Sequence, residues 1–201
     1  MAWIKIIEYN EAKSSLKRIY DRVKGPDNNI DNVLLIHSLR PHSLTGHMTL
    51  YKNVLHNSAN LLPKWYLEAL GVYVSKLNFC DYCVMHHFTG FKRELKDDAR
   101  ADAFLKAVQE DDLKHFFNPK LNQGFRYAKK LTKKLRKIKE KDVEKLRGMD
   151  FSDGEILEIN QVVSYFNYVN RTVVGLGVGL KGDILGLSPN DSNDPNQWNH
   201  Q

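Results

Sequence analysis

Residues 80–87 read CDYCVMHH, so that Cys80 and Cys83 stand three positions apart and His87 follows one helical turn later. On a helix with about 100° per residue, these three side chains fall within an arc of about 60°. An imidazole one turn from Cys83 can take the thiol proton or hold the thiolate as an ion pair. Two thiols at this spacing can close a short disulfide after one is oxidised. The octapeptide therefore predicts a helical segment with thiol chemistry.

Upstream of this octapeptide, Glu68 interrupts a segment that is otherwise apolar. The positions around it, 65–74, are almost all aromatic or aliphatic. A carboxylate is costly to bury without a partner. Glu68 therefore either pairs with a polar group of the site or lies on the solvent side of its helix, and the segment alone leaves both open.

The rest of the chain also follows a helical pattern, and strand patterns are scarce. Asn10 is a candidate cap of the first helix, Pro63 suits the first turn of another, and Ser152 with Glu155 forms a capping-box pattern. Helices are expected over 10–24, 30–38, 41–57, 63–77, 80–95, 99–108, 119–135, 141–147 and 156–178. The sequence therefore predicts an all-α protein.

The 201 residues suit one domain, which we place at 1–187. Residues 188–201 are rich in Asn, Asp and Pro, and Trp198 is their one large apolar residue. We expect this segment to be flexible or draped on a neighbouring subunit. No stretch reaches the ~18 apolar residues of a membrane span, and the first residues do not read as a signal peptide. A cytoplasmic protein is expected.

The chain is basic, with a net charge of +6 and a pI of about 9.2. Much of the excess lies in residues 129–141, which carry eight Lys and Arg. No aromatic residues alternate with these charges, as a surface that stacks on bases would require. We interpret the stretch as a solvated helix face and expect no nucleic-acid partner.

The pattern Glu68-x11-Cys80-x-x-Cys83-x3-His87 resembles the active-site motif of the alkylhydroperoxidase D (AhpD) family. That family belongs to the carboxymuconolactone decarboxylase-like superfamily. Several longer stretches are similar to its peroxidase-related branch: 62–87, 153–157, 165–171 and 175–178. The resemblance covers most of the chain, roughly residues 7–186.

The resemblance implies an AhpD-like helical bundle with the Cys-x-x-Cys motif at a helix N-terminus, assembled as a dimer, trimer or hexamer. It implies a thiol-dependent peroxidase with a hydroperoxide substrate, an external thiol or dithiol reductant, and no bound cofactor or metal. Cys83 would attack the peroxide, and Cys80, the more exposed thiol, would resolve it. His87 would be the base, and Glu68 would orient or charge it.

One position departs from the family pattern. The best-known members have a histidine between the cysteines, whereas this chain has Tyr82, whose phenol is a poor base at neutral pH. His86 is about 100° round the helix from His87, so a structural or surface position is favoured. Four further histidines receive no role: His37, His42, His47 and His56.

Three other functions stay open. A thiol–disulfide oxidoreductase would use the same two cysteines without strong peroxidase activity. A lactone decarboxylase of the same superfamily would not depend on a cysteine pair. A zinc-binding module built on Cys80, Cys83 and His87 would need a fourth ligand, and the sequence has no second cysteine pair.

Overall fold

The computed structural model describes residues 2–114 and 116–200. Over these residues it contains nine α-helices, three short 3-10 helices and no strand, which confirms the all-α prediction. The α-helices are α1 (Ser14–Val23), α2 (Asn32–Leu35), α3 (Pro41–Leu55), α4 (Lys64–Leu77), α5 (Asp81–Leu95), α6 (Asp98–Gln109), α7 (Pro119–Lys133), α8 (Glu140–Arg147) and α9 (Asp153–Gly175). None of them is both long enough and apolar enough to span a membrane.

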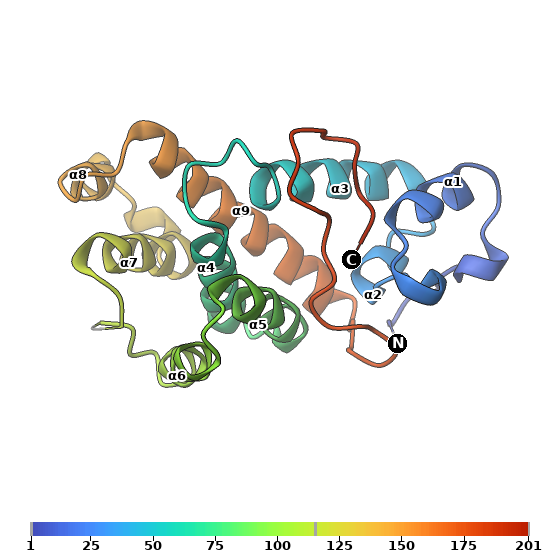
Figure 1. Ribbon diagram of the computed structural model, residues 1–201, viewed down its shortest axis with the longest axis horizontal. Coiled ribbons are helices and arrows are strands. Elements are labelled where there is room, and N and C mark those ends of the chain that lie inside the picture. The colour runs from blue at the N-terminus through green and yellow to red at the C-terminus, as the bar shows by residue number, and fades with distance from the viewer. Residues whose placement is uncertain (1, 115, 201) are drawn as a thin grey trace.

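Helix α9 runs diagonally through the molecule, with α4 and α5 beside it at the centre (Figure 1). Helices α6 to α8 lie on one side of this centre, and α1 to α3 lie on the other. Helix α4 packs against both α5 and α9. It is buried on nearly every side, as expected for a helix that is apolar all round.

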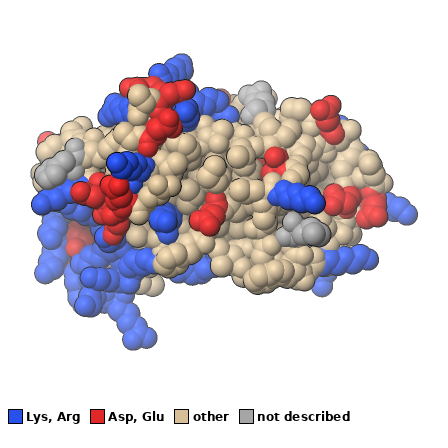
Figure 2. Space-filling model, turned by 90° about the horizontal axis from the view of Figure 1, so that it is seen from below, with Lys and Arg blue, Asp and Glu red and all other residues tan. Residues whose placement is uncertain are grey.

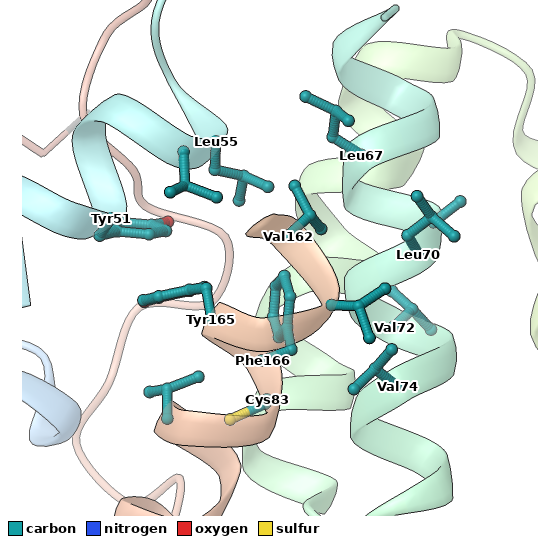
Figure 3. Packing of buried hydrophobic residues seen from close by; sticks show 14 of the residues in the cluster. Tyr51, Leu55, Leu67, Leu70, Val72, Val74, Cys83, Val162, Tyr165 and Phe166 are labelled. Atoms are coloured by element: carbon teal, nitrogen blue, oxygen red, sulfur yellow. The ribbon is translucent and has the colours of Figure 1, made fainter. Parts of the chain in front are cut away.

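The contact between α4 and α9 depends on one small residue. The ring of Phe166 fills the space beside Gly71, where an added Cβ would lie 2.2 Å from a ring carbon. Phe166 in turn lies close to Val72 and Cys83 in the buried cluster (Figure 3). The thiol pair thus belongs to the hydrophobic core and not to a surface loop.

The turn between α4 and α5 places Cys80. Phe79 has a φ of 59°, a left-handed conformation that ends α4, and Cys80 is the N-cap residue of α5. Asn78 fixes the turn to α9, because its side-chain amide donates to Asn170 at 3.0 Å. The expected position of the Cys-x-x-Cys motif at a helix N-terminus is therefore observed.

Most expected helices agree with the structure to within a few residues, and the capping box of Ser152 and Glu155 is present. The exceptions lie near the N-terminus. Asn10 does not cap α1, because it lies in a 3-10 turn (Tyr9–Glu11) and the helix begins only at Ser14. The helix expected over 30–38 is a single turn, α2.

Residues 188–200 differ from their prediction as well. The sequence predicted a flexible segment or one draped on a neighbouring subunit, but these residues cross α3 of their own chain (Figure 1). Trp198 is only 2% exposed, and the Arg22 guanidinium lies 3.8 Å from the centre of its ring. The ammonium group of buried Lys52 donates to the carbonyl of Asn190. Low hydrophobicity hid this packing, because apart from Trp198 the contacts are polar, such as the ion pair of Lys64 with Asp191.

Basic side chains gather at the end of the molecule that α7 and α8 occupy (Figure 2). Two of the lysines there are paired, Lys129 with Asp111 and Lys130 with Asp142. Such pairing on the surface is typical of a solvated helix face and adds little to stability.

Candidate active site

A cavity of about 40 Å³ is lined by residues 31–34 at the start of α2, by α3, α4, α5 and α9, and by residues 186–200. Glu68, Cys83 and His87 line this cavity, and the Cys80 sulfur lies 2.9 Å behind that of Cys83. The structure therefore brings the four predicted residues together. A water molecule needs roughly 10–15 Å³ of such space, so the cavity has room for a few small polar groups.

The carboxylate of Glu68 and the ring of His87 form a buried pair. Glu68 is 1% exposed, and its Oε2 lies 2.7 Å from His87 Nδ1. Burial alone would raise the pKa of Glu68, but the charge of His87 and its hydrogen bond hold the pKa below the ordinary value. Gly90, one turn after His87, leaves room for this carboxylate, since a Cβ there would lie 3.2 Å from it. The solvent-facing alternative for Glu68 is thereby excluded.

The two thiols are free and equally withdrawn from solvent. Cys80 is 1% exposed and Cys83 is 3% exposed, so the expectation that Cys80 is the more accessible thiol is wrong. Cys80 is closed off because Phe79 turns the chain inward and the Cys80 amide donates to the carbonyl of Ser75. Of the two, Cys83 is the thiol that lines the cavity.

The pKa values of the two thiols depend mainly on the hydrogen bond between them and on their burial. A hydrogen bond from Cys83 lowers the pKa of the Cys80 thiol, whereas burial raises the pKa of Cys83 well above its usual range. The Asn170 amide favours the thiolate at both positions. Two thiols that share one hydrogen bond lose a first proton easily and a second only with difficulty.

His87 does not ionise Cys83 directly in this structure. Within residues 2–114 and 116–200, no hydrogen bond joins the two side chains, and the His87 ring instead meets Phe166 edge-on at 4.6 Å between centroids. The one-turn spacing brings both residues to the cavity but does not bring sulfur and nitrogen into contact. The predicted ion pair between Cys83 and His87 is therefore absent from the described residues.

Tyr82 and His86 form part of a second polar wall. The Tyr82 hydroxyl donates to Asp183 at 2.5 Å and accepts from the Val33 amide at 3.1 Å. The His86 ring lies against the Tyr82 ring, and its Nε2 is 3.2 Å from Asp183 without alignment for a hydrogen bond. His86 is thus a buried residue that lines the cavity, which agrees with the structural position and excludes the surface one.

Sequence reasoning missed several residues that line the same cavity: Asp31, His47, Tyr51, Tyr165 and His200. Burial lowers the pKa of His47 to about 3 and that of His200 to about 4, so both rings are neutral at pH 7. His47 stands one turn before Tyr51 on the inward face of α3, and that spacing was a usable signal. No local pattern pointed to Asp31 or His200.

Among the described residues, no three His, Cys, Asp or Glu side chains are grouped as the ligands of a metal ion would be. No protein family model matches the chain, and no curated protein is similar enough to it to count as a match.

Solved structures do match. An uncharacterized peroxidase-related protein of Ralstonia eutropha JMP134, an alkylhydroperoxidase AhpD core, superposes with a TM-score of 0.76 and 22% identity, over 92% of this chain and 97% of that one. An uncharacterized peroxidase-related protein of Silicibacter sp. TM1040 gives 0.75 and 20%, over 88% and 90%. The debrominase Bmp8, bound to 2,3,4-tribromopyrrole, gives 0.64 and 14%, over 83% of both chains. The chain therefore has the fold of the AhpD core proteins.

Proposed function

We propose that the chain is a member of the AhpD-like superfamily and a thiol-dependent peroxidase that cycles through a Cys80–Cys83 disulfide. One observation carries the proposal. The two free thiols have their sulfurs 2.9 Å apart, and Cys83 lines a small cavity. The Glu68–His87 pair lines the same cavity. Attack, resolution and proton transfer each have a residue in place.

The first step is the loss of one proton from the thiol pair. Cys80 is the more acidic thiol, and transfer of the Cys83 proton along the hydrogen bond to Cys80 moves the negative charge to Cys83. The Cys83 thiolate then attacks one peroxide oxygen, so that an S–O bond forms and the O–O bond breaks. Cys83 becomes a sulfenic acid, and the second oxygen leaves as an alcohol once it is protonated.

The second step closes the disulfide. The Cys80 sulfur attacks the sulfenic sulfur of Cys83, and the hydroxyl group leaves as water with the Cys80 proton. Both sulfurs start in contact, so little movement of α5 is needed. An external thiol or dithiol then reduces the disulfide and returns the pair to its starting state.

The Glu68–His87 pair supports proton movement at the cavity. Glu68 holds Nδ1, which leaves Nε2 as the ring nitrogen free to exchange a proton with the bound substrate or with water. These two residues are thus proposed as a proton carrier for the reaction and not as a direct partner of the thiol.

A second function uses the same thiols. A thiol–disulfide oxidoreductase would react Cys80 or Cys83 with a partner's disulfide in place of a peroxide. Burial of both sulfurs restricts that disulfide as much as it restricts the external reductant of the peroxidase. The likeness to a debrominase raises reductive dehalogenation as a further possibility. The cavity is small, about 40 Å³, and this favours the oxygen pair of a peroxide as the reacting group.

The test is peroxide consumption by the purified protein with a panel of thiol and dithiol reductants. Wild type is expected to turn over, Cys83→Ser to be inactive, and Cys80→Ser to react once and stop. His42→Gln, an exposed histidine on α3, serves as the matched control. A wild type that reduces disulfides but consumes no peroxide would replace this proposal with the oxidoreductase function. We also propose the homo-oligomer that the family resemblance implies, and sedimentation velocity on the same sample tests it.

A further inference from the structure

Asp31 presents a buried carboxyl group to the cavity. It precedes α2, it is 5% exposed, and it lines the same cavity as Cys83. Its Oδ1 atom is buried and has no hydrogen-bond partner among the described residues. A buried carboxyl oxygen without a partner is unfavourable for folding, so its presence calls for an explanation.

The usual structural explanation does not apply to Asp31. Aspartate is common at the N-cap of a helix because its side chain accepts hydrogen bonds from the first amides. Asp31 occupies the N-cap of α2 but makes no such bond. The carboxylate of Asp183 accepts from the Asn32 amide instead, at 3.0 and 3.1 Å. The side chain of Asp31 is thus left for the cavity.

The proposed peroxidase reaction needs a proton at this point. When the O–O bond breaks, the leaving oxygen of an alkyl hydroperoxide departs as an alkoxide unless an acid protonates it. Because the proposed role of His87 Nε2 is to carry away the proton that the thiol pair loses, the leaving oxygen needs an acid of its own. A second acid in the cavity would complete the reaction.

We propose that Asp31 is this acid and donates its proton to the alcohol oxygen that leaves as Cys83 is oxidised. The inference rests on the peroxidase function proposed above. In the step, Cys83 thiolate, hydroperoxide and protonated Asp31 give Cys83 sulfenic acid, alcohol and Asp31 carboxylate. The proton released when the thiol pair ionised returns to Asp31, so the cycle balances.

The surroundings of Asp31 suit this role. Burial, opposed by His86 and reinforced by Asp183, raises the pKa of Asp31 to about 7. A general acid works best when its pKa lies near the working pH, because enough of it is protonated and it still gives up the proton readily. The charges of His86 and Asp183 thus tune the acidity of Asp31 in opposite directions.

The test compares two oxidants whose leaving groups differ in their need for a proton. In single-turnover assays, Asp31→Asn is expected to slow the oxidation of Cys83 by tert-butyl hydroperoxide by ~100-fold or more. Oxidation by peracetic acid should change little, because acetate leaves without a proton. Alkylation of Cys83 by iodoacetamide should also be unchanged, which controls for folding. Asp27→Asn, an exposed aspartate of the same N-terminal region, is the matched control.

The results distinguish failure of the acid role of Asp31 from failure of the peroxidase function. An equal loss with both oxidants overturns the acid role and assigns Asp31 a structural one. Unchanged rates with both oxidants also overturn it. A wild type that reacts with neither oxidant overturns the peroxidase function, and the role of Asp31 falls with it.

Discussion

Glu68 Oε2 and His87 Nδ1 lie 2.7 Å apart in the interior, where α4 packs against α5. A carboxylate that binds one ring nitrogen fixes the orientation of the imidazole and leaves the other nitrogen for the cavity. In the proposed reaction, Glu68 orients the ring and His87 carries the proton, so the two members of the pair are not equivalent.

Removal of His87 should slow the reaction more than removal of the Glu68 charge. General acid–base catalysis contributes roughly 100-fold or more, so His87→Ala is expected to lose about that factor in the rate of disulfide formation. Glu68→Gln should lose less, because it acts through the histidine. Stopped-flow oxidation at a fixed peroxide concentration measures both. A larger loss in Glu68→Gln than in His87→Ala would contradict the assigned order.

The two cysteines should respond differently when each is left alone. In Cys80→Ser, peroxide is expected to trap Cys83 as a sulfenic acid, since the resolving thiol is gone. In Cys83→Ser, Cys80 should form sulfenic acid far more slowly, because it does not line the cavity. Mass spectrometry with a sulfenate-specific reagent reads both results. The reverse pattern would exchange the two roles.

The pH dependence of alkylation should follow the thiol pair and not His87. Cys83→Ala is expected to raise the pKa of Cys80, since the hydrogen bond from Cys83 is the main cause of its lowering. Cys80→Ala should leave the pKa of Cys83 above its ordinary value, because burial persists. Rates of iodoacetamide reaction across pH give these inflections. If His87→Ala shifts the profile more than Cys83→Ala does, the thiol pair is not the controlling element.

Asp31 should make the fold less stable as the pH rises. Its pKa is raised in the folded protein from 3.8 to about 7, so the folded state binds the proton more tightly than the unfolded chain. Stability is fully retained below pH ~4 and falls as the pH rises towards 7. At ~1.4 kcal/mol per pKa unit, this shift of the Asp31 pKa corresponds to a change of about 4 kcal/mol in the free energy of unfolding.

Urea unfolding at pH 5 and pH 8 tests this prediction. Asp31→Asn should be at least as stable as wild type at pH 8, and it should lose less stability between the two pH values. Asp27→Asn should behave like wild type. A wild type and an Asp31→Asn variant with identical pH dependence would mean that Asp31 is already ionised at pH 5.

Trp198 should hold residues 188–200 on the helical body. Trp198→Ala is expected to reduce the free energy of unfolding by about 3–5 kcal/mol, if the segment unfolds with the rest. If the segment detaches alone, the cost is smaller and alkylation of Cys83 speeds up, because Ser188 and His200 line the cavity. Gln197→Ala, at an exposed neighbour, should change neither quantity. If Trp198→Ala changes neither the free energy of unfolding nor the rate of Cys83 alkylation, Trp198 does not anchor the segment.

Much of the helical framework could be predicted from the sequence because its signals are local. The apolar run around Glu68, the pattern at Ser152 and the turn before Cys80 each appear within a few residues. The grouping of Glu68, Cys80, Cys83 and His87 followed from helical spacing and from the family resemblance. These are the parts in which sequence distance and spatial distance are closely related.

The second wall of the cavity could not be predicted in the same way. Asp31 and Asp183 are far apart in the sequence, and they meet only because residues 183–200 fold back over the N-terminal helices. The acidity of the thiols was also mispredicted, since the helical spacing suggested an ion pair between Cys83 and His87. Burial of Cys83 and its contact with Cys80 decide the ionisation, and neither is visible in a helical wheel.

The site has two parts that differ in how readily their sequence can be changed: the packed helices and the covering segment, residues 188–200. The thiols and the Glu68–His87 pair lie on helices of the packed centre, where a change of one methylene disturbs many neighbours. The cover reaches the cavity through Ser188 and His200. It is held by Trp198, by the bond from Lys52 to the Asn190 carbonyl and by the ion pair of Lys64 with Asp191. Under the proposed function, the cover is therefore the place where substrate selectivity can be redesigned by exchange of a short peptide, with the thiols and the Glu68–His87 pair left unchanged.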